Sequence, residues 1–364
     1  MKSFPFSLLL CLPLISLACT QKPTSDEANQ APKDPYLWLE DVEGAKAMDW
    51  VKEQNKKSLA ELTKTPRFKS LESEALGILQ SKDKIPMVSD IGGKHVYNFW
   101  QDDKHVRGLW RRTTLTSYKQ KRPKWETLLD LDQVAKADKE NWVFKGANCL
   151  QPQYERCLIY LSRGGKDAIV VKEFSIASKS FVKNGFELPE AKSWVGWYDS
   201  QNMFVATDFG AGSMTESGYP RIVKLWKRGT DLSQAKTVFE GTVKDMAAYG
   251  TSLFNPEGKI SLVTQLLDFY SDKTFVYSGQ KLIQVPKPDS AKLLGYFKGF
   301  FILELRKPWE VEGLQFAAGS LVAMQKGAVK AGSVRGGDLQ LVYSPDEKSS
   351  LLTAAILKDR LVLN

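Results

Sequence analysis

The pattern of apolar and polar positions changes once along the chain, near Lys84. Before that point, apolar residues recur every three to four positions, which is the spacing of one helix face. This spacing predicts helices over 43–63 and 66–81, and Pro66 fits the preference of proline for a first helical turn. The apolar positions of the first helix are Ala45, Met48, Val51, Leu59 and Leu62.

Beyond Lys84 the chain consists of short runs rich in β-branched and aromatic residues, separated by Gly, Asp, Asn and Pro, which predict strands. These runs recur about every 50 residues, a period typical of propeller repeats. The second unit divides into four predicted strands, at 142–150, 156–163, 168–176 and 179–188. Sets of strands begin near Val88, Trp142, Trp194, Asp245, Ala291 and Asp338.

Four antiparallel strands per unit are typical of a propeller blade, because each blade buries both faces against its neighbours. The predicted fold class is therefore all-β. Residues 83–364 are predicted to form an incomplete β-propeller of about five and a half blades, preceded by a short α-helical segment over 34–82. A β-sandwich is the alternative, but its strands would not group in fours.

The chain stops at residues 361–364, directly after a strand-like run. An open propeller leaves an unpaired strand edge and a bare blade face. We therefore expect the natural molecule to be longer, or this chain to be a truncated product.

The N-terminus predicts export. Lys2 precedes an apolar run that ends at Ala18 and is too short to span a bilayer as a stable helix. We interpret residues 1–18 as a secretory signal peptide and the polar, proline-containing residues 19–33 as a flexible tether. The predicted location is the bacterial periplasm, the outer membrane as a lipoprotein, or the medium as a secreted protein.

Two processing routes remain open at the end of this signal. Ser16 and Ala18 satisfy the small-x-small pattern of ordinary signal peptidase. Ala18 directly before Cys19 instead resembles a bacterial lipoprotein box, although Ser16 matches that box poorly. Lipidation of Cys19 would anchor the protein to a membrane.

Cysteine usage bears on both questions. Removal of the signal leaves Cys19, Cys149 and Cys157, an odd set for an oxidising compartment, and lipidation of Cys19 would remove the spare thiol. Cys149 ends one predicted strand and Cys157 begins the next, so antiparallel neighbours can form a hairpin disulfide between them. Two reduced cysteines on one hairpin are the alternative.

The composition is that of a globular chain, with 43% hydrophobic and 11% aromatic residues. The formal net charge is +9, but the basic residues are scattered along the sequence. The densest cluster falls around Pro123 in a loop-like stretch, where a solvated hairpin tip explains it, so no nucleic-acid binding is predicted. That cluster comprises Lys119, Lys121, Arg122 and Lys124.

Candidate chemistry is sparse. No Gly-x-Ser-x-Gly nucleophile motif occurs, and the nearest stretch, 210–214, follows a strand and is interpreted as a turn. The two histidines, His95 and His105, lie at strand and turn positions and favour structural roles. Residues 162–167 join two strands and are interpreted as a β-turn. No catalytic, cofactor-binding or metal-binding residue is predicted, and no cofactor.

Several longer stretches are similar to the prolyl oligopeptidase family of serine peptidases. The similarity is close over residues 34–241 and rests on the repeat pattern alone beyond them. The stretches are DPYLWLED at 34–41, WVKEQN at 50–55, VRGLWRRTT at 106–114, LSRGGKDA at 161–168, SGYPR at 217–221 and WKRG at 226–229.

This resemblance implies a seven-bladed propeller that caps an α/β-hydrolase domain carrying serine, aspartate and histidine. It implies that the propeller admits only short peptides and that residues 34–82 dock on the hydrolase domain, with Leu37, Trp38 and Leu39 partly exposed or refolded without that partner. The predicted function is the substrate-gating part of such an endopeptidase, inactive without its catalytic domain. The alternative is a non-catalytic, surface-anchored propeller that binds peptides or proteins.

Overall fold

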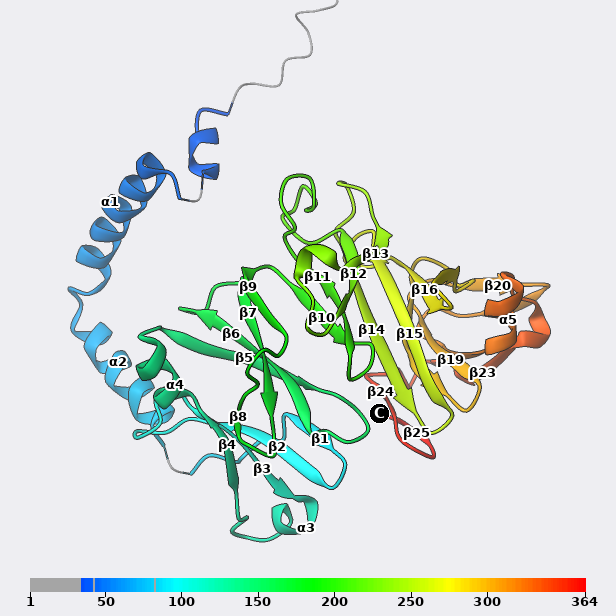
Figure 1. Cartoon of the computed structure of the whole chain (residues 1–364), viewed down its shortest axis with the longest axis horizontal. Coiled ribbons are helices and arrows are strands. Elements are labelled where there is room, and N and C mark those ends of the chain that lie inside the picture. The colour runs from blue at the N-terminus through cyan, green and yellow to red at the C-terminus, as the bar shows by residue number, and fades with distance from the viewer. Residues whose placement is uncertain (1–33, 42, 82) are drawn as a thin grey trace, which may run out of the picture. The chain divides into compact units, whose positions relative to one another are not determined.

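The computed structural model of the chain describes residues 34–41, 43–81 and 83–364 (Figure 1). The predicted signal peptide, the tether and Cys19 lie outside the described residues. The described chain separates into two compact units, with the division between Ile78 and Leu79.

The first unit is helical. It contains the 3-10 helix η1 (Leu37–Glu40), α1 (Ala45–Leu62) and most of α2 (Pro66–Leu79), so both predicted helices are confirmed. Pro66 is the first residue of α2. Ala47 is the one buried residue of α1, and α2 has none, so these helices bury almost none of their apolar face.

The second unit consists of small antiparallel sheets that follow one another in chain order. Blade 1 comprises β1 (Asp90–Gly92), β2 (His95–Trp100), β3 (Leu109–Thr114) and β4 (Glu126–Asp130). Blade 2 comprises β5 (Trp142–Cys149), β6 (Arg156–Arg163), β7 (Ile169–Ser175), β8 (Ser180–Phe181) and β9 (Glu187–Ala191). Blade 3 comprises β10 (Trp194–Trp197), β11 (Asn202–Ala206), β12 (Ile222–Lys227) and β13 (Lys236–Glu240).

Two further blades and a hairpin complete the described chain. Blade 4 comprises β14 (Ala247–Asn255), β15 (Gly258–Leu266), β16 (Asp272–Ser278) and β17 (Lys281–Gln284). Blade 5 comprises β18 (Ala291–Phe297), β19 (Phe300–Leu305), β22 (Leu321–Gln325) and β23 (Leu339–Tyr343). The hairpin of β24 (Ala354–Ile356) and β25 (Leu361–Leu363) follows and contacts β18.

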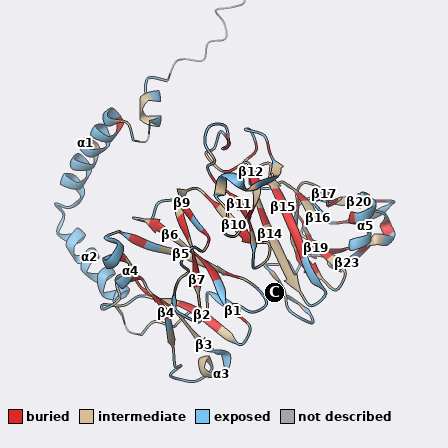
Figure 2. Ribbon diagram, viewed as in Figure 1, coloured by how far each residue is buried: buried red, intermediate tan, exposed pale blue. Residues whose placement is uncertain are grey.

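Buried residues are concentrated on the strands of the blades (Figure 2). Their apolar clusters lie between consecutive blades, as in a propeller. In β11, Met203 and Val205 pack with Leu158 and Leu188 of blade 2, whereas their neighbours Phe204 and Ala206 pack with blade 4. Alternate side chains of a strand point to opposite faces, so one central strand serves two cores. Similar mixed clusters join blades 1 and 2, blades 4 and 5, and blade 5 and the last hairpin.

The predicted start of a sixth unit is wrong. Asp338 does not begin a sixth unit, because the strand that follows it, β23, pairs with β22 and completes blade 5. Blade 5 is longer than the 50-residue period, since it also contains the small hairpin β20 (Trp309–Val311) and β21 (Leu314–Phe316) and the helix α5 (Lys326–Ala331).

The fourth strand predicted in blade 2, at 179–188, is divided into β8 and β9, both paired with β7. Between β8 and β9, the Phe186 amide donates a hydrogen bond of 3.0 Å to Oε2 of the buried Glu173 carboxylate on β7. The expectation of strands alone after Lys84 also needs correction. Two further helices, α3 (Leu115–Tyr118) and α4 (Leu131–Asp138), occur in blade 1 and in its connection to blade 2.

Candidate functional site

A hollow of about 950 Å³ lies where segments of four sheets converge, and we call it the funnel. One wall is the turn between β5 and β6, and the others are residues 253–259 of blade 4, residues 294–297 of blade 5 and residues 356–358 of the last hairpin. A space bounded by several blades can admit an extended ligand, which a single sheet face cannot enclose.

The wall from blade 2 is a disulfide-bridged hairpin. Cys149 and Cys157 lie opposite each other in the β5–β6 register, with their Cα atoms 3.9 Å apart and their sulfur atoms bonded. Between them, residues 150–155 form a turn in which the Leu150 amide donates to the Arg156 carbonyl and the Tyr154 amide donates to the Leu150 carbonyl. The corresponding turns of blades 1, 4 and 5 contain only two residues between their strands.

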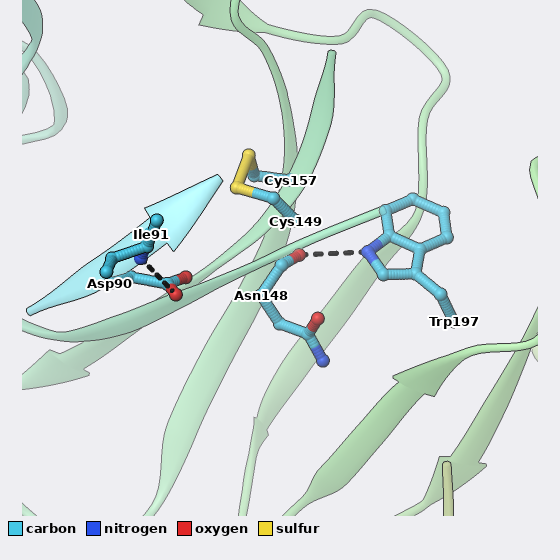
Figure 3. Close-up of a disulfide and its surroundings, with 6 residues drawn as sticks. All are labelled: Asp90, Ile91, Asn148, Cys149, Cys157 and Trp197. Atoms are coloured by element: carbon cyan, nitrogen blue, oxygen red, sulfur yellow. Dashed lines mark hydrogen bonds between the residues drawn. A yellow bond between two sulfur atoms is a disulfide. The ribbon is translucent and has the colours of Figure 1, made fainter. Parts of the chain in front are cut away.

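Blade 1 contacts this hairpin through Tyr154. A Cβ atom added to Gly92, the last residue of β1, would lie 2.7 Å from Cδ1 of the Tyr154 ring. Only glycine therefore allows the ring to approach the backbone so closely. Figure 3 shows the disulfide beside Asp90 and Ile91 of the same strand. Cys149, Cys157 and Tyr154 belong to the core that joins blades 1 and 2.

Blade 3 contacts the hairpin on its other side. The indole Nε1 of Trp197 donates a hydrogen bond of 2.9 Å to the carbonyl of Asn148, next to Cys149 (Figure 3). Trp197 is itself buried in the core between blades 2 and 3. The hairpin is thus held from both neighbouring blades.

A buried ion cluster reinforces the junction between blades 2 and 3. The Glu173 side chain is fully buried and accepts two hydrogen bonds from the Arg228 guanidinium, at 2.7 and 2.9 Å, and one from Arg156 at 2.9 Å. Burial alone would raise the pKa of Glu173, but the hydrogen bonds from Arg228, the Phe186 amide and Arg156 hold the pKa below its ordinary value. The carboxylate is therefore ionised and shared between two blades.

Blade 4 contributes a cation to the lining of the funnel. Lys259 Nζ donates to the carbonyl of Tyr198 in blade 3 at 2.8 Å and lies 3.3 Å from the centroid of the Tyr198 ring. Partial burial lowers the pKa of Lys259, although Asp199 acts in the opposite direction. This lysine can interact with carbonyl or carboxylate groups of a ligand in the funnel.

The two histidines have structural surroundings. His105 Nδ1 lies 3.0 Å from Oδ1 of Asp102, and Oδ2 of Asp102 accepts from the indole of Trp100 at 2.9 Å. These bonds close the connection between β2 and β3. His95 lies on β2, and burial lowers its pKa.

The other candidate stretches also form turns. Ser213 Oγ donates to the Gly210 carbonyl at 2.6 Å in the connection between β11 and β12, as the turn interpretation predicts. Residues 164–168 connect β6 to β7, and the basic cluster lies between α3 and β4. Within the described ranges, no group of three or more His, Cys, Asp or Glu side chains is arranged to hold a metal ion.

The lengths and apolar character of the helices bear on membrane insertion. None in the described part of the chain combines the length and the apolar character needed to cross a membrane.

Comparison with known proteins identifies the fold and the family. Residues 18–259 match the model of the prolyl oligopeptidase N-terminal β-propeller domain, which is more than half of the chain. The chain belongs to the prolyl oligopeptidase family. It is 37% identical over 380 residues to an uncharacterised peptidase of Sinorhizobium fredii, a match that covers 100% of this chain and 52% of the relative.

Further similar proteins are consistent with this assignment. An uncharacterised peptidase of Rickettsia prowazekii is 31% identical, with 90% of this chain and 47% of the relative covered. The structure of a post-proline cleaving enzyme from Rickettsia typhi superposes with a TM-score of 0.81 at 30% identity, covering 90% of this chain and 49% of that one. Oligopeptidase B from Leishmania major, at 11% identity and a TM-score of 0.59, shares the fold.

The match is therefore to one half of a longer protein. The chain spans about half the length of the curated relatives that it matches. Its described residues form the propeller part of a prolyl oligopeptidase-like peptidase.

Three residues of this site could not be recognised from the sequence. Tyr154, Trp197 and Glu173 are ordinary members of strand or turn patterns. One signal existed for Glu173, an acidic residue within the otherwise apolar run of β7, where a buried charge requires a partner. The sequence did not indicate that its partner Arg228 lies 55 positions away.

Proposed function

We propose that this chain is the substrate-gating propeller of a serine endopeptidase of the prolyl oligopeptidase type that acts on short peptides. The observation that carries the proposal is the funnel, a space of about 950 Å³ bounded by turns from separate blades. Folded proteins cannot enter a space of this size, whereas an extended peptide can. The family membership supplies the reaction class.

We propose further that the chemistry belongs to an α/β-hydrolase domain that acts together with this propeller. The 364 residues contain no Gly-x-Ser-x-Gly motif, and the two histidines hold turn and strand contacts. The matched relatives are about twice as long, which leaves room for such a domain in them. The exposed apolar residues of α1 and α2 supply a docking surface for it.

A peptidase assay tests this proposal. The purified chain is incubated with a fluorogenic peptide that contains proline, alone and together with the separately produced half of the Sinorhizobium fredii relative that this chain does not match. We expect no turnover by the chain alone, and turnover by the mixture that is restricted to short peptides. Turnover by the chain alone that a serine-directed inhibitor abolishes would contradict the proposal. So would equal turnover of short peptides and folded proteins by the mixture.

We also propose that the protein is exported and that Cys19 carries a lipid. A disulfide between Cys149 and Cys157 supports export, because such bonds persist in oxidising compartments. Mass spectrometry of the mature N-terminus tests the lipid. The expected result is a chain that begins at Cys19 with the added mass of acyl groups, and a bare Cys19 would rule the lipid out.

A further inference from the structure

We propose that the disulfide-bridged turn 150–155 sets the width of the funnel and that Tyr154 is the positioning residue through which it holds blade 1. This inference rests on the proposed function only for its consequence, the control of peptide entry into the funnel. The contacts and the test concern the blades themselves, so they hold or fail independently of any peptidase activity.

Two further hollows border the turn beside these contacts. One of about 400 Å³ lies next to the contact of Tyr154 with blade 1 and is lined on that side by Gly92, His95 and Arg112. The other, of about 410 Å³, lies toward blade 3 and is lined there by Ser200, Gln201 and Arg228. Away from the core contact of Tyr154, the turn therefore borders open space, so a small number of contacts determines its position.

Those contacts are identifiable. The disulfide fixes the base of the turn, and the Trp197–Asn148 hydrogen bond ties the same base to blade 3. Toward blade 1, the Tyr154 ring packs on Gly92. Tyr154 has φ +57°, a left-handed conformation that few non-glycine residues adopt.

The first strand of blade 1 has few other contacts. This strand, β1, has only three residues and pairs only with β2. Ile91 is 62% exposed, so the middle of β1 contributes little to the core. Gly92 is the buried residue of β1, and the rings of Tyr154 and of Tyr97 in the neighbouring strand pack against it.

The same tyrosine also faces the funnel. Gln151, Pro152 and Tyr154 line the funnel together with the last hairpin and the turn that precedes Lys259. A displacement of the turn toward either flanking hollow changes the distance to the opposite wall. Holding blade 1 and limiting the funnel are thus two consequences of one position of Tyr154.

Hydrogen–deuterium exchange of the full chain tests the contact with blade 1. Tyr154→Ala removes the ring, whereas Tyr154→Phe keeps it and serves as the matched control. We expect amides 89–97 to exchange roughly tenfold faster or more in Tyr154→Ala, with residues 300–305 and 321–325 of blade 5 unchanged and Tyr154→Phe like the native chain. Reduction of the native disulfide with a phosphine should accelerate the same segment without any substitution.

Chemical labelling of Lys259 tests the effect on the funnel. Two amine-reactive esters, one small and one bulky, are compared on the native chain, on both variants and on the reduced chain. We expect the labelling ratio of bulky to small reagent to rise in Tyr154→Ala and on reduction, and to stay native in Tyr154→Phe. The proposal is overturned by native exchange at 89–97 in Tyr154→Ala, by faster exchange in all blades alike, or by an unchanged labelling ratio.

Discussion

The two units of this molecule use their apolar residues in opposite ways. In the blades, side chains such as Phe204, Leu303 and Leu161 are fully buried, and each core is shared by two consecutive sheets. In the helices, Leu59, Leu62 and the other large apolar side chains face solvent; Leu62 is 63% exposed. The blades therefore provide one another's cores, and the helices lack a comparable one.

This difference shows that a helical period in the sequence predicts a helix but does not say what covers its apolar face. A blade obtains its cover from the next repeat, which the same chain encodes. The α1 and α2 faces remain uncovered in the described residues, apart from the local packing of Trp38 on Trp50, whose ring centroids are 6.2 Å apart. Leu37 is exposed and Trp38 and Leu39 are half-buried, as expected of a segment that is partly exposed.

The largest effect is expected at the ion cluster between blades 2 and 3. Glu173→Ala leaves Arg228 without its buried carboxylate, and breaking such a pair costs about 3 to 5 kcal/mol of unfolding free energy. Urea unfolding of the variant measures this loss. The exposed Glu53→Ala on α1, which removes an ion pair with Lys57 at the surface, is the control and should leave the blades' transition unchanged. A loss below about 1 kcal/mol for Glu173→Ala would contradict this role.

A matched pair of leucines compares the two units directly. Leu303→Ala in β19 removes a fully buried side chain and should cost about 2 to 5 kcal/mol. Leu62→Ala at the end of α1 removes an exposed one and should change the unfolding free energy by less than about 0.5 kcal/mol. Thermal and urea unfolding of both variants measure the two losses of unfolding free energy. Equal losses would refute the difference between the blades and the helices.

The smallest effect is a pH dependence from Asp102 in blade 1. Burial alone would raise the pKa of this carboxyl, but hydrogen bonds from the Trp100 indole and from the His105 and Lys104 amides hold its pKa well below the ordinary value of 3.8. The unfolded chain therefore binds this proton first as the pH falls. Stability from Asp102 is complete above about pH 5 and decreases below it. Asp102→Asn should reduce this acid-dependent loss in unfolding titrations, and an unchanged pH profile would contradict the assignment.

Much of the fold could be predicted because helices and blades follow local periodicities. The bounds of α1, α2, β5 and β6 follow directly from apolar spacing and turn residues. The end of blade 5 could not be predicted this way, because the β20–β21 hairpin and α5 lengthen that repeat.

The candidate site was predictable only where its parts are close in sequence. Cys149 and Cys157 are eight positions apart on one hairpin, so their proximity is a local property. The contacts of Tyr154 with Gly92 and of Glu173 with Arg228 depend on how consecutive blades stack. Stacking brings together residues more than fifty positions apart, and no single repeat contains that information.

Limited proteolysis tests the central claim most directly, namely that the blades support themselves while the apolar faces of α1 and α2 need the proposed partner domain to cover them. Trypsin cleavage after Lys52, Lys56 and Lys64 is timed by mass spectrometry, with and without the half of the Sinorhizobium fredii relative that this chain does not match. The account predicts rapid cleavage in α1 and at Lys64 just after it, slow cleavage in the blades, and a manyfold slower loss of the helical segment when that half is added. The account would be contradicted if the helices are cleaved as slowly as the blades, or if the added half does not change the rate of cleavage.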